Sequence, residues 1–203
     1  MNLRALAALA ALAAGGCASA GDAVDPATER QIQVRIANLA TLRGNDQVQN
    51  IEILGVTLHP ISIPYLLDGL AGDPNARIRA GCAQALGLSQ DGRAVEALAL
   101  AVGSDTEPGV RYTAAYNLGL FRDARGLPTL FEALRGDDPV NRKLAGDCLF
   151  ALTGFDLGYD FMARPEERSA AAARWEEWYR QRGPAGVAPL LLPGGRPAQR
   201  PPR

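Results

Sequence analysis

The sequence predicts an all-α fold, and the observation behind this prediction is a pattern that returns every 32 residues. A Leu-Gly pair, an aspartate and a leucine each recur at this spacing. The recurring positions are Leu54-Gly55, Leu86-Gly87 and Leu118-Gly119; Asp73, Asp105 and Asp137; and Leu66, Leu98 and Leu130. Self-similarity at this period is typical of stacked helical hairpins, each burying its apolar face against its neighbours. We therefore expect a right-handed α-solenoid of about four hairpins, closed by a C-terminal capping helix.

Residues 1–16 have the features of a signal peptide. Arg4 supplies a positive charge, residues 5–14 are leucine and alanine, and small residues follow. The apolar run is shorter than the roughly 20 residues that a membrane-spanning helix needs. We therefore expect the chain to be exported.

Two processing sites compete after this segment. Residues 12–17, Leu-Ala-Ala-Gly-Gly-Cys, resemble a bacterial lipobox, with alanine at position 14 where leucine is usual. The resemblance implies lipidation of Cys17, and because Ala18 is not an aspartate it implies an outer-membrane lipoprotein facing the periplasm. The alternative is cleavage after Ala20, which would release a soluble periplasmic or secreted protein. We favour the lipobox, with residues 17–27 as a short tether.

The repeat domain is expected over residues 28–181, with short and long helices alternating. A first helix ends at Gly44 and a second covers residues 46–58, where Pro60 ends it. The next expected helices are a short one at 64–71, a long one at 75–88, and short ones at 94–102 and 127–134. Apolar residues at i, i+4, i+7 and i+8 mark one face of each long helix, as in Ile78, Cys82, Ala85 and Leu86.

The repeated residues resemble HEAT repeats, most closely the short bacterial kind first noted in phycobilisome lyases. The resemblance covers residues 45–154 and rests on Asp73, Ile78, Arg79 and Ala85-Leu86-Gly87, and on Asp105, Val110, Arg111 and Leu118-Gly119. The third unit departs, with Lys143 at the arginine position and Leu152-Thr153-Gly154 at its end. In such repeats the aspartates cap turns and the arginines bridge adjacent repeats, so we expect both to be structural.

The C-terminal part is expected to close the repeats and then to lose structure. A helix over residues 166–182 carries Trp175 and Trp178, which we expect to fold back over the last repeat. Residues 182–203 are rich in Pro, Gly and Arg, a composition typical of disorder. Leu190-Leu191-Leu192 could dock on a partner, but an apolar patch without a role is the preferred interpretation.

Composition and motifs argue against an enzyme, a metal site or a cofactor. A net charge of −1 gives no overall attraction to nucleic acid. His59, the single histidine, has no nucleophile motif near it and is interpreted as a turn residue. There is no Cys-x-x-Cys or His-x-x-x-His pattern for a metal. Cys82 and Cys148 are expected at equivalent positions two repeats apart, too far for a disulfide.

We expect the chain to be a non-enzymatic envelope adaptor that binds an unidentified protein through the inner curve of its long helices. The candidate contact residues are Arg77, Gln84, Tyr112, Tyr116 and Arg142, with Arg122 as a further option. Tyrosine and arginine are the types that anchor interfaces. One alternative is an accessory subunit that binds a peptide for an exported enzyme or assembly machine. Another is an enzyme that uses Asp156 and Asp160 in the C-terminal loop.

Overall fold

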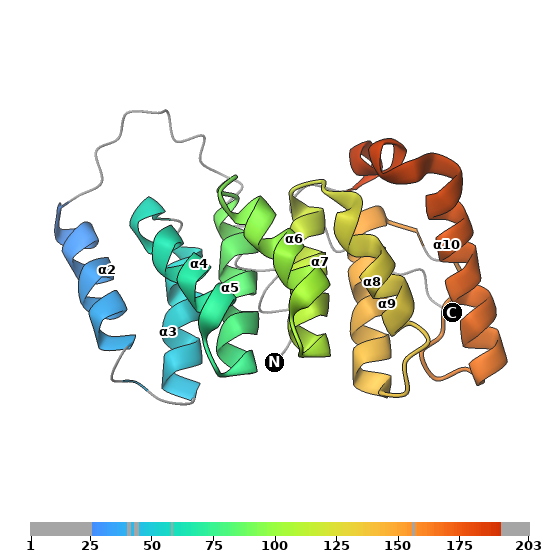
Figure 1. Ribbon diagram of the computed structural model, residues 1–203, viewed down its shortest axis with the longest axis horizontal. Coiled ribbons are helices and arrows are strands. Elements are labelled where there is room, and N and C mark those ends of the chain that lie inside the picture. Colours follow the sequence, from blue (N-terminus) through green and yellow to red (C-terminus); the bar gives the residue numbers. More distant parts are fainter. Residues whose placement is uncertain (1–25, 40–41, 43–44, 58, 156, 192–203) are drawn as a thin grey trace. The chain divides into compact units, whose positions relative to one another are not determined.

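The computed structural model describes residues 26–39, 42, 45–57, 59–155 and 157–191, and these form helices, turns and loops (Figure 1). The predicted all-α class is confirmed. The chain divides into two compact units, residues 1–94 and 95–203. The predicted signal peptide, Cys17 and residues 192–203 lie outside the described residues. None of the described helices is long and apolar enough to cross a membrane.

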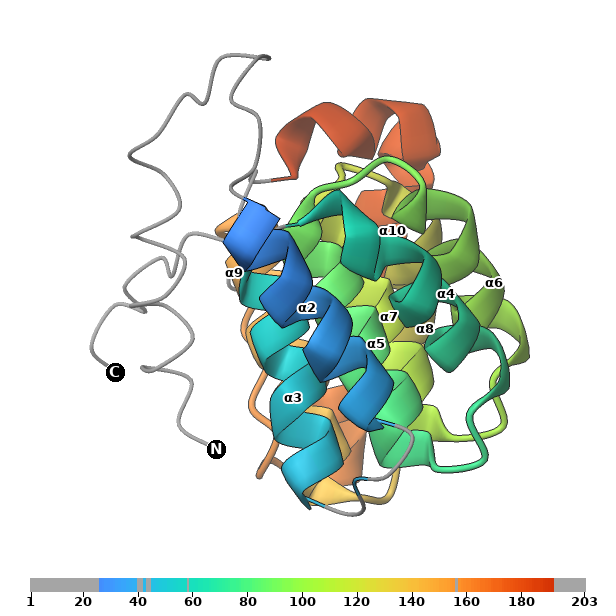
Figure 2. The same cartoon turned by 90° about the vertical axis from the view of Figure 1, so that its left-hand side faces the viewer.

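The first unit contains two helical hairpins. They are formed by α2 (Pro26–Leu39) with α3 (Asn45–Val56), and by α4 (Ile63–Gly72) with α5 (Ala76–Ser89); a short 3-10 turn, η1 (Pro60–Ser62), joins them. Helix α2 therefore begins within the expected tether. Helices α3 and α4 both pack against α5, and α2 lies beside α3 (Figure 2). Ile51, Leu54, Leu66 and Leu86 are fully buried and form the core of this unit.

The second unit contains two more hairpins and the C-terminal helix. The hairpins are α6 (Ala94–Ser104) with α7 (Pro108–Leu120), and α8 (Leu127–Ala133) with α9 (Pro139–Thr153). The 3-10 turn η2 (Ala124–Gly126) precedes α8, and α10 (Pro165–Val187) follows α9 and leads into η3 (Ala188–Leu190). Helix α7 packs against α8 and α9, and α10 packs against α8 and η2.

The repeated Leu-Gly pair has a steric explanation. A Cβ atom added to Gly55 would lie 2.6 Å from the Cα of Ala85, and one added to Gly119 would lie 2.6 Å from Cδ1 of Leu152. Both distances are shorter than side-chain contacts allow. Glycine at these positions therefore lets α3 approach α5 closely, and α7 approach α9.

The repeated arginines clamp the turn inside their own hairpin, and they define the register of the repeats. Nη1 of Arg79 donates to the carbonyl of Asp73 at 2.9 Å, and Nη1 of Arg111 donates to that of Asp105 at 2.9 Å. In the third repeat Arg142 does the same, donating to the Gly136 carbonyl at 3.0 Å. The prediction that Lys143 takes this position was wrong, because the sequence was aligned on the Leu-Gly pair rather than on the clamp.

The expected contact between adjacent repeats is made by a different arginine. Arg93 and Arg125, 32 residues apart, each stand two residues after an aspartate with which they pair. Arg93 also donates to the Pro60 carbonyl at 3.4 Å, and Arg125 pairs with Glu96 at 2.9 Å. This Asp-x-Arg element connects consecutive hairpins within each unit. The sequence analysis overlooked it, although it recurs at the same 32-residue spacing.

The aspartates shape the turns but do not cap the helices. Asp73 Oδ1 accepts from the backbone N–H of Asn75 at 2.8 Å, and Asn75 then caps α5 by accepting from Arg77 N at 3.0 Å. In the third repeat Asp138 is the cap, since its Oδ1 accepts from the N–H of Val140. The expected capping role of Asp73 therefore belongs to the residue two positions later.

The C-terminal helix covers α8 as expected, but it continues beyond its predicted end. Trp175 is 2% exposed and its ring stacks on that of Phe131 with centroids 6.3 Å apart. At Gly183 the backbone takes a φ of 63°, which glycine tolerates, and the chain turns. Val187 and Leu191 beyond this turn are buried. The predicted disorder is therefore wrong for residues 183–191, because the turn returns apolar side chains to the protein.

Candidate functional site

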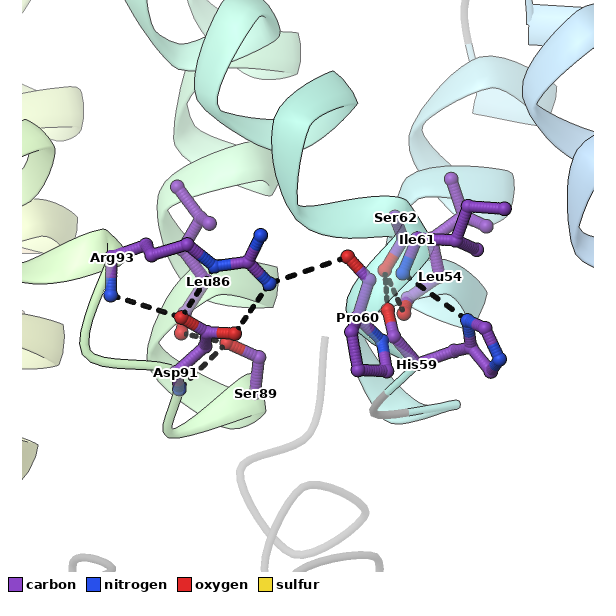
Figure 3. A network of polar contacts seen from close by, with 9 residues as sticks. All are labelled: Leu54, His59, Pro60, Ile61, Ser62, Leu86, Ser89, Asp91 and Arg93. Atoms are coloured by element: carbon purple, nitrogen blue, oxygen red, sulfur yellow. Dashed lines mark hydrogen bonds and ion pairs between the residues drawn. The ribbon is translucent and has the colours of Figure 1, made fainter. Parts of the chain in front are cut away.

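His59 has a structural role in the first unit. Its Nδ1 atom accepts a hydrogen bond from the backbone N–H of Ile61 at 3.2 Å, which caps η1 (Figure 3). The Ser62 hydroxyl donates to the His59 carbonyl at 2.7 Å. Arg93 reaches the same turn from the next hairpin through its bond to the Pro60 carbonyl. The interpretation of His59 as a turn residue is confirmed.

The two buried cysteines are poorly suited to nucleophilic chemistry. Cys82 lies in the first unit and Cys148 in the second, and both are free thiols. Burial, with a smaller contribution from Asp73, raises the pKa of Cys82 to about 12. Burial, with a smaller contribution from Asp147, likewise raises the pKa of Cys148 to about 12. Thiolates, the reactive form, are therefore scarce at neutral pH.

Register on the clamping arginine also separates these two cysteines. Cys82 follows Arg79 by three residues, whereas Cys148 follows Arg142 by six. The residue equivalent to Cys82 in the third repeat is therefore Ala145, which is fully buried like Cys82. The prediction that the cysteines occupy equivalent positions was wrong, for the same reason that Lys143 was misplaced.

The carboxylates of the C-terminal loop do not form a described cluster. Asp156 lies outside the described residues. Asp160 accepts from the backbone N–H of Met162 at 2.9 Å and shapes a turn. Among the described residues, no group of three or more His, Cys, Asp or Glu side chains is placed to hold a metal ion.

The structure distributes the five predicted contact residues over three helices. Arg77 is exposed and Gln84 half-buried, and both lie on α5 in the first unit. Tyr112 and Tyr116 are half-buried, one turn apart on α7 in the second unit. Arg142 on α9 is only 7% exposed, so its prediction as a surface residue was wrong. Its guanidinium is occupied by carbonyls of Gly136, Asp137 and Phe161.

The arginine register shows which residues accompany the two tyrosines. Counted from the clamping arginine, Tyr112 and Tyr116 on α7 correspond to Lys143 and Asp147 on α9. Lys143 and Asp147 form an ion pair along α9, and Val140 in the preceding turn is 71% exposed. We call these five residues the tyrosine face. The sequence analysis missed its α9 members because the third repeat had been shifted.

The two helices of the tyrosine face are in direct contact. Helix α7 packs against α9, and Tyr116 is close enough to Cys148 for the two to interact electrostatically. Burial, followed by the effect of Cys148, raises the pKa of Tyr116 to about 12. The phenol therefore stays neutral at neutral pH, with an apolar ring against α9. The face combines aromatic surface, one exposed aliphatic side chain and one ion pair.

The described chain thus consists of helical-hairpin repeats with a partly apolar face on their second helices. Residues 63–149, from the start of α4 into α9, match the family model for HEAT repeats. The chain is a HEAT-repeat protein. No curated protein matches it. HEAT repeats are generally scaffolds for protein interaction and are typically non-enzymatic.

Proposed function

We propose that this protein is a non-enzymatic adaptor that binds another protein through the tyrosine face of its second unit. The observation that carries the proposal is the placement of Tyr112 and Tyr116 on the same side as Lys143 and Asp147. Tyrosine offers a large contact area at a small entropic cost, and it is enriched among residues that dominate binding energy. The ion pair beside the rings supplies polar groups that fix orientation.

We further propose that this adaptor works in the bacterial cell envelope. Support comes from residues 1–20, in which a positively charged start and an apolar run precede Cys17. A lipid on Cys17 would hold the repeats near the membrane surface, and several acyl chains would make the attachment stable. Substitution of Cys17→Ser tests this anchor, and unchanged membrane fractionation of the variant would refute it.

The adaptor proposal is tested by crosslinking at the tyrosine face. A photoreactive amino acid at position 112 in the native envelope should trap a reproducible partner. The same amino acid at Leu100, which is 67% exposed on α6, is the matched control and should trap none of it. Recovery of the same proteins from both positions would show that the tyrosine face is not a specific interface.

Two substitutions separate binding from folding. Lys143→Glu replaces an exposed cation, so it should preserve the fold while opposing Asp147 and weakening partner capture several-fold. Arg164→Glu, a charge reversal at an exposed position before α10, is the control. Equal partner capture by the two variants would contradict the proposed role of the face.

A further inference from the structure

Helix α10 carries a second surface feature, an open groove on the side that faces the loop after α9. Its lining includes Leu157, Arg174, Trp178 and Arg182. Trp178 is half-buried, and the ring of Phe155, 42% exposed, meets it edge-on with centroids 5.9 Å apart. The floor of the groove is therefore aromatic and partly open to solvent. We refer to it as the α10 groove.

The two arginines of the α10 groove are held in place without a carboxylate partner among the described residues. Arg174 donates through Nε to the Leu157 carbonyl at 2.8 Å and through Nη2 to that of Gly158 at 3.2 Å. The Arg182 guanidinium lies 5.4 Å from the centre of the Trp178 ring and donates to the Trp178 carbonyl. Each guanidinium keeps further N–H donors, since arginine has five.

The acidic residue of the groove is already engaged. Both carboxylate oxygens of Glu177 accept hydrogen bonds, one from Arg180 and the other from Gln181. Arg174 and Arg182 therefore give the groove an uncompensated positive charge on either side of an aromatic centre. Charge complementarity calls for an occupant with carboxylates and an apolar side chain between them.

The spacing along α10 specifies the shape of that occupant. Arg174, Trp178 and Arg182 stand at i, i+4 and i+8, so about 6 Å of helix axis separates each from the next. In an extended peptide, side chains two residues apart point to the same side and lie about 6.6–6.8 Å apart. An extended segment with an apolar residue flanked two positions away on each side by acidic residues matches this stripe.

We propose that the α10 groove binds such a segment of another protein: an extended acidic peptide whose central apolar side chain rests on Trp178. The site is separate from the tyrosine face and does not depend on it. The chain's own residues 192–203 contain three arginines and no acidic residue, so they are electrostatically unsuited to the groove.

The test uses the full 203-residue chain in detergent and a fluorescent peptide with phenylalanine at its centre and glutamate two positions before and after it. We expect saturable binding by fluorescence anisotropy, which weakens as salt increases. A peptide with lysine in place of both glutamates, or serine in place of phenylalanine, should bind at least ~10-fold more weakly. Equal binding of the lysine peptide would overturn the proposal.

Matched variants assign the binding to the groove. Arg182→Gln removes one cation at an exposed position and should weaken binding ~5–10-fold. Arg164→Gln, the same change near the start of α10 and outside the groove, should leave binding unchanged, as should Tyr112→Ala on the tyrosine face. Equal affinities of the Arg182→Gln and Arg164→Gln variants would refute the assignment.

Two other occupants predict different results. If the chain's own C-terminus filled the groove, removal of residues 192–203 would raise peptide affinity many-fold, whereas our proposal expects no such increase. If a second copy filled it, sedimentation would show a dimer that Arg182→Gln dissociates. Either result would replace the acidic peptide as the occupant. Failure of peptide binding leaves crosslinking at position 112 unaffected, so the two proposals are tested independently.

Discussion

Replacement of Arg142 by methionine tests why this charged side chain is buried. The Arg142 guanidinium donates to the carbonyls of Gly136, Asp137 and Phe161 at 3.0, 2.6 and 3.1 Å. The first two bonds hold the turn before α9, and the third holds the loop before α10. Methionine retains an unbranched apolar side chain of similar reach, but it removes the donor from all three carbonyls.

The expected loss of stability follows from these contacts. A hydrogen bond from a charged donor contributes about 1.5–3 kcal/mol, and leaving a buried acceptor unsatisfied costs about 1–3 kcal/mol. The three bonds share one guanidinium, so their contributions are not fully additive. We therefore expect Arg142→Met to lower the free energy of unfolding by about 3–4 kcal/mol.

Arg111 is the matched control in the preceding repeat of the same unit. Its Nη1 donates to the carbonyls of Asp105 at 2.9 Å and Thr106 at 3.3 Å, and the side chain is half-buried. With fewer bonds and more access to water, Arg111→Met should cost about 1–2 kcal/mol. The difference between the two variants isolates burial and the bond to the Phe161 carbonyl.

Urea unfolding followed by tryptophan fluorescence is the assay. Trp175 and Trp178 are the two tryptophans of the chain and both lie on α10, so their emission reports the second unit. Far-ultraviolet circular dichroism monitors the helices of the whole chain in the same samples. If Arg142→Met cost no more than Arg111→Met, the clamp would not explain why an arginine is buried at this position.

Three further substitutions have defined outcomes. Gly55→Ala should lower the free energy of unfolding by about 2 kcal/mol, because its Cβ would meet the backbone of Ala85, whereas Gly81→Ala, a helix-interior position with room for a Cβ, should raise it by about 0.5–1 kcal/mol; circular dichroism during urea unfolding measures both. Arg122→Gly should stabilise the second unit by about 0.5–1 kcal/mol in the fluorescence assay, since Arg122 has a φ of 60° that costs a non-glycine residue free energy; no change would contradict the strain. Because burial raises the pKa of Cys148 from 9.0 to about 12, its stabilising contribution is complete below pH 9 and is lost as pH rises toward 12, where only the unfolded chain ionises first; Cys148→Ala should flatten the alkaline fall in stability, and an identical slope would refute this.

Much of the architecture was predictable from spacing alone. The 32-residue period located the hairpins, and prolines and glycines placed helix ends within a few residues of their observed positions, as with α8 at Leu127–Ala133 against the expected 127–134. Trp175 was recognised as a capping residue because a large aromatic side chain on a final helix needs a buried contact. These features are local, so the sequence expresses them directly.

The candidate site was predicted less completely. Tyr112 and Tyr116 are half-buried on one side of α7, as their four-residue spacing indicated. Their α9 counterparts, Lys143 and Asp147, were missed because the α7-to-α9 register shortens to 31 residues between Arg111 and Arg142. The Leu-Gly motif conceals this change, since the pair is replaced by Leu-Thr-Gly at the end of α9. Only the hydrogen bonds of the arginines identify equivalent positions.

The sequence by itself determined the class of fold, because the periodic placement of apolar side chains can be satisfied only by helices that pack against one another. Only the tertiary structure decided which charged side chains are buried and which apolar ones return to the core. Arg142 is buried because a loop 19 residues further along brings the Phe161 carbonyl to it. Leu191 is buried because the left-handed backbone at Gly183 turns the chain back. Both outcomes depend on groups distant in sequence, and composition or periodicity carries no record of such meetings.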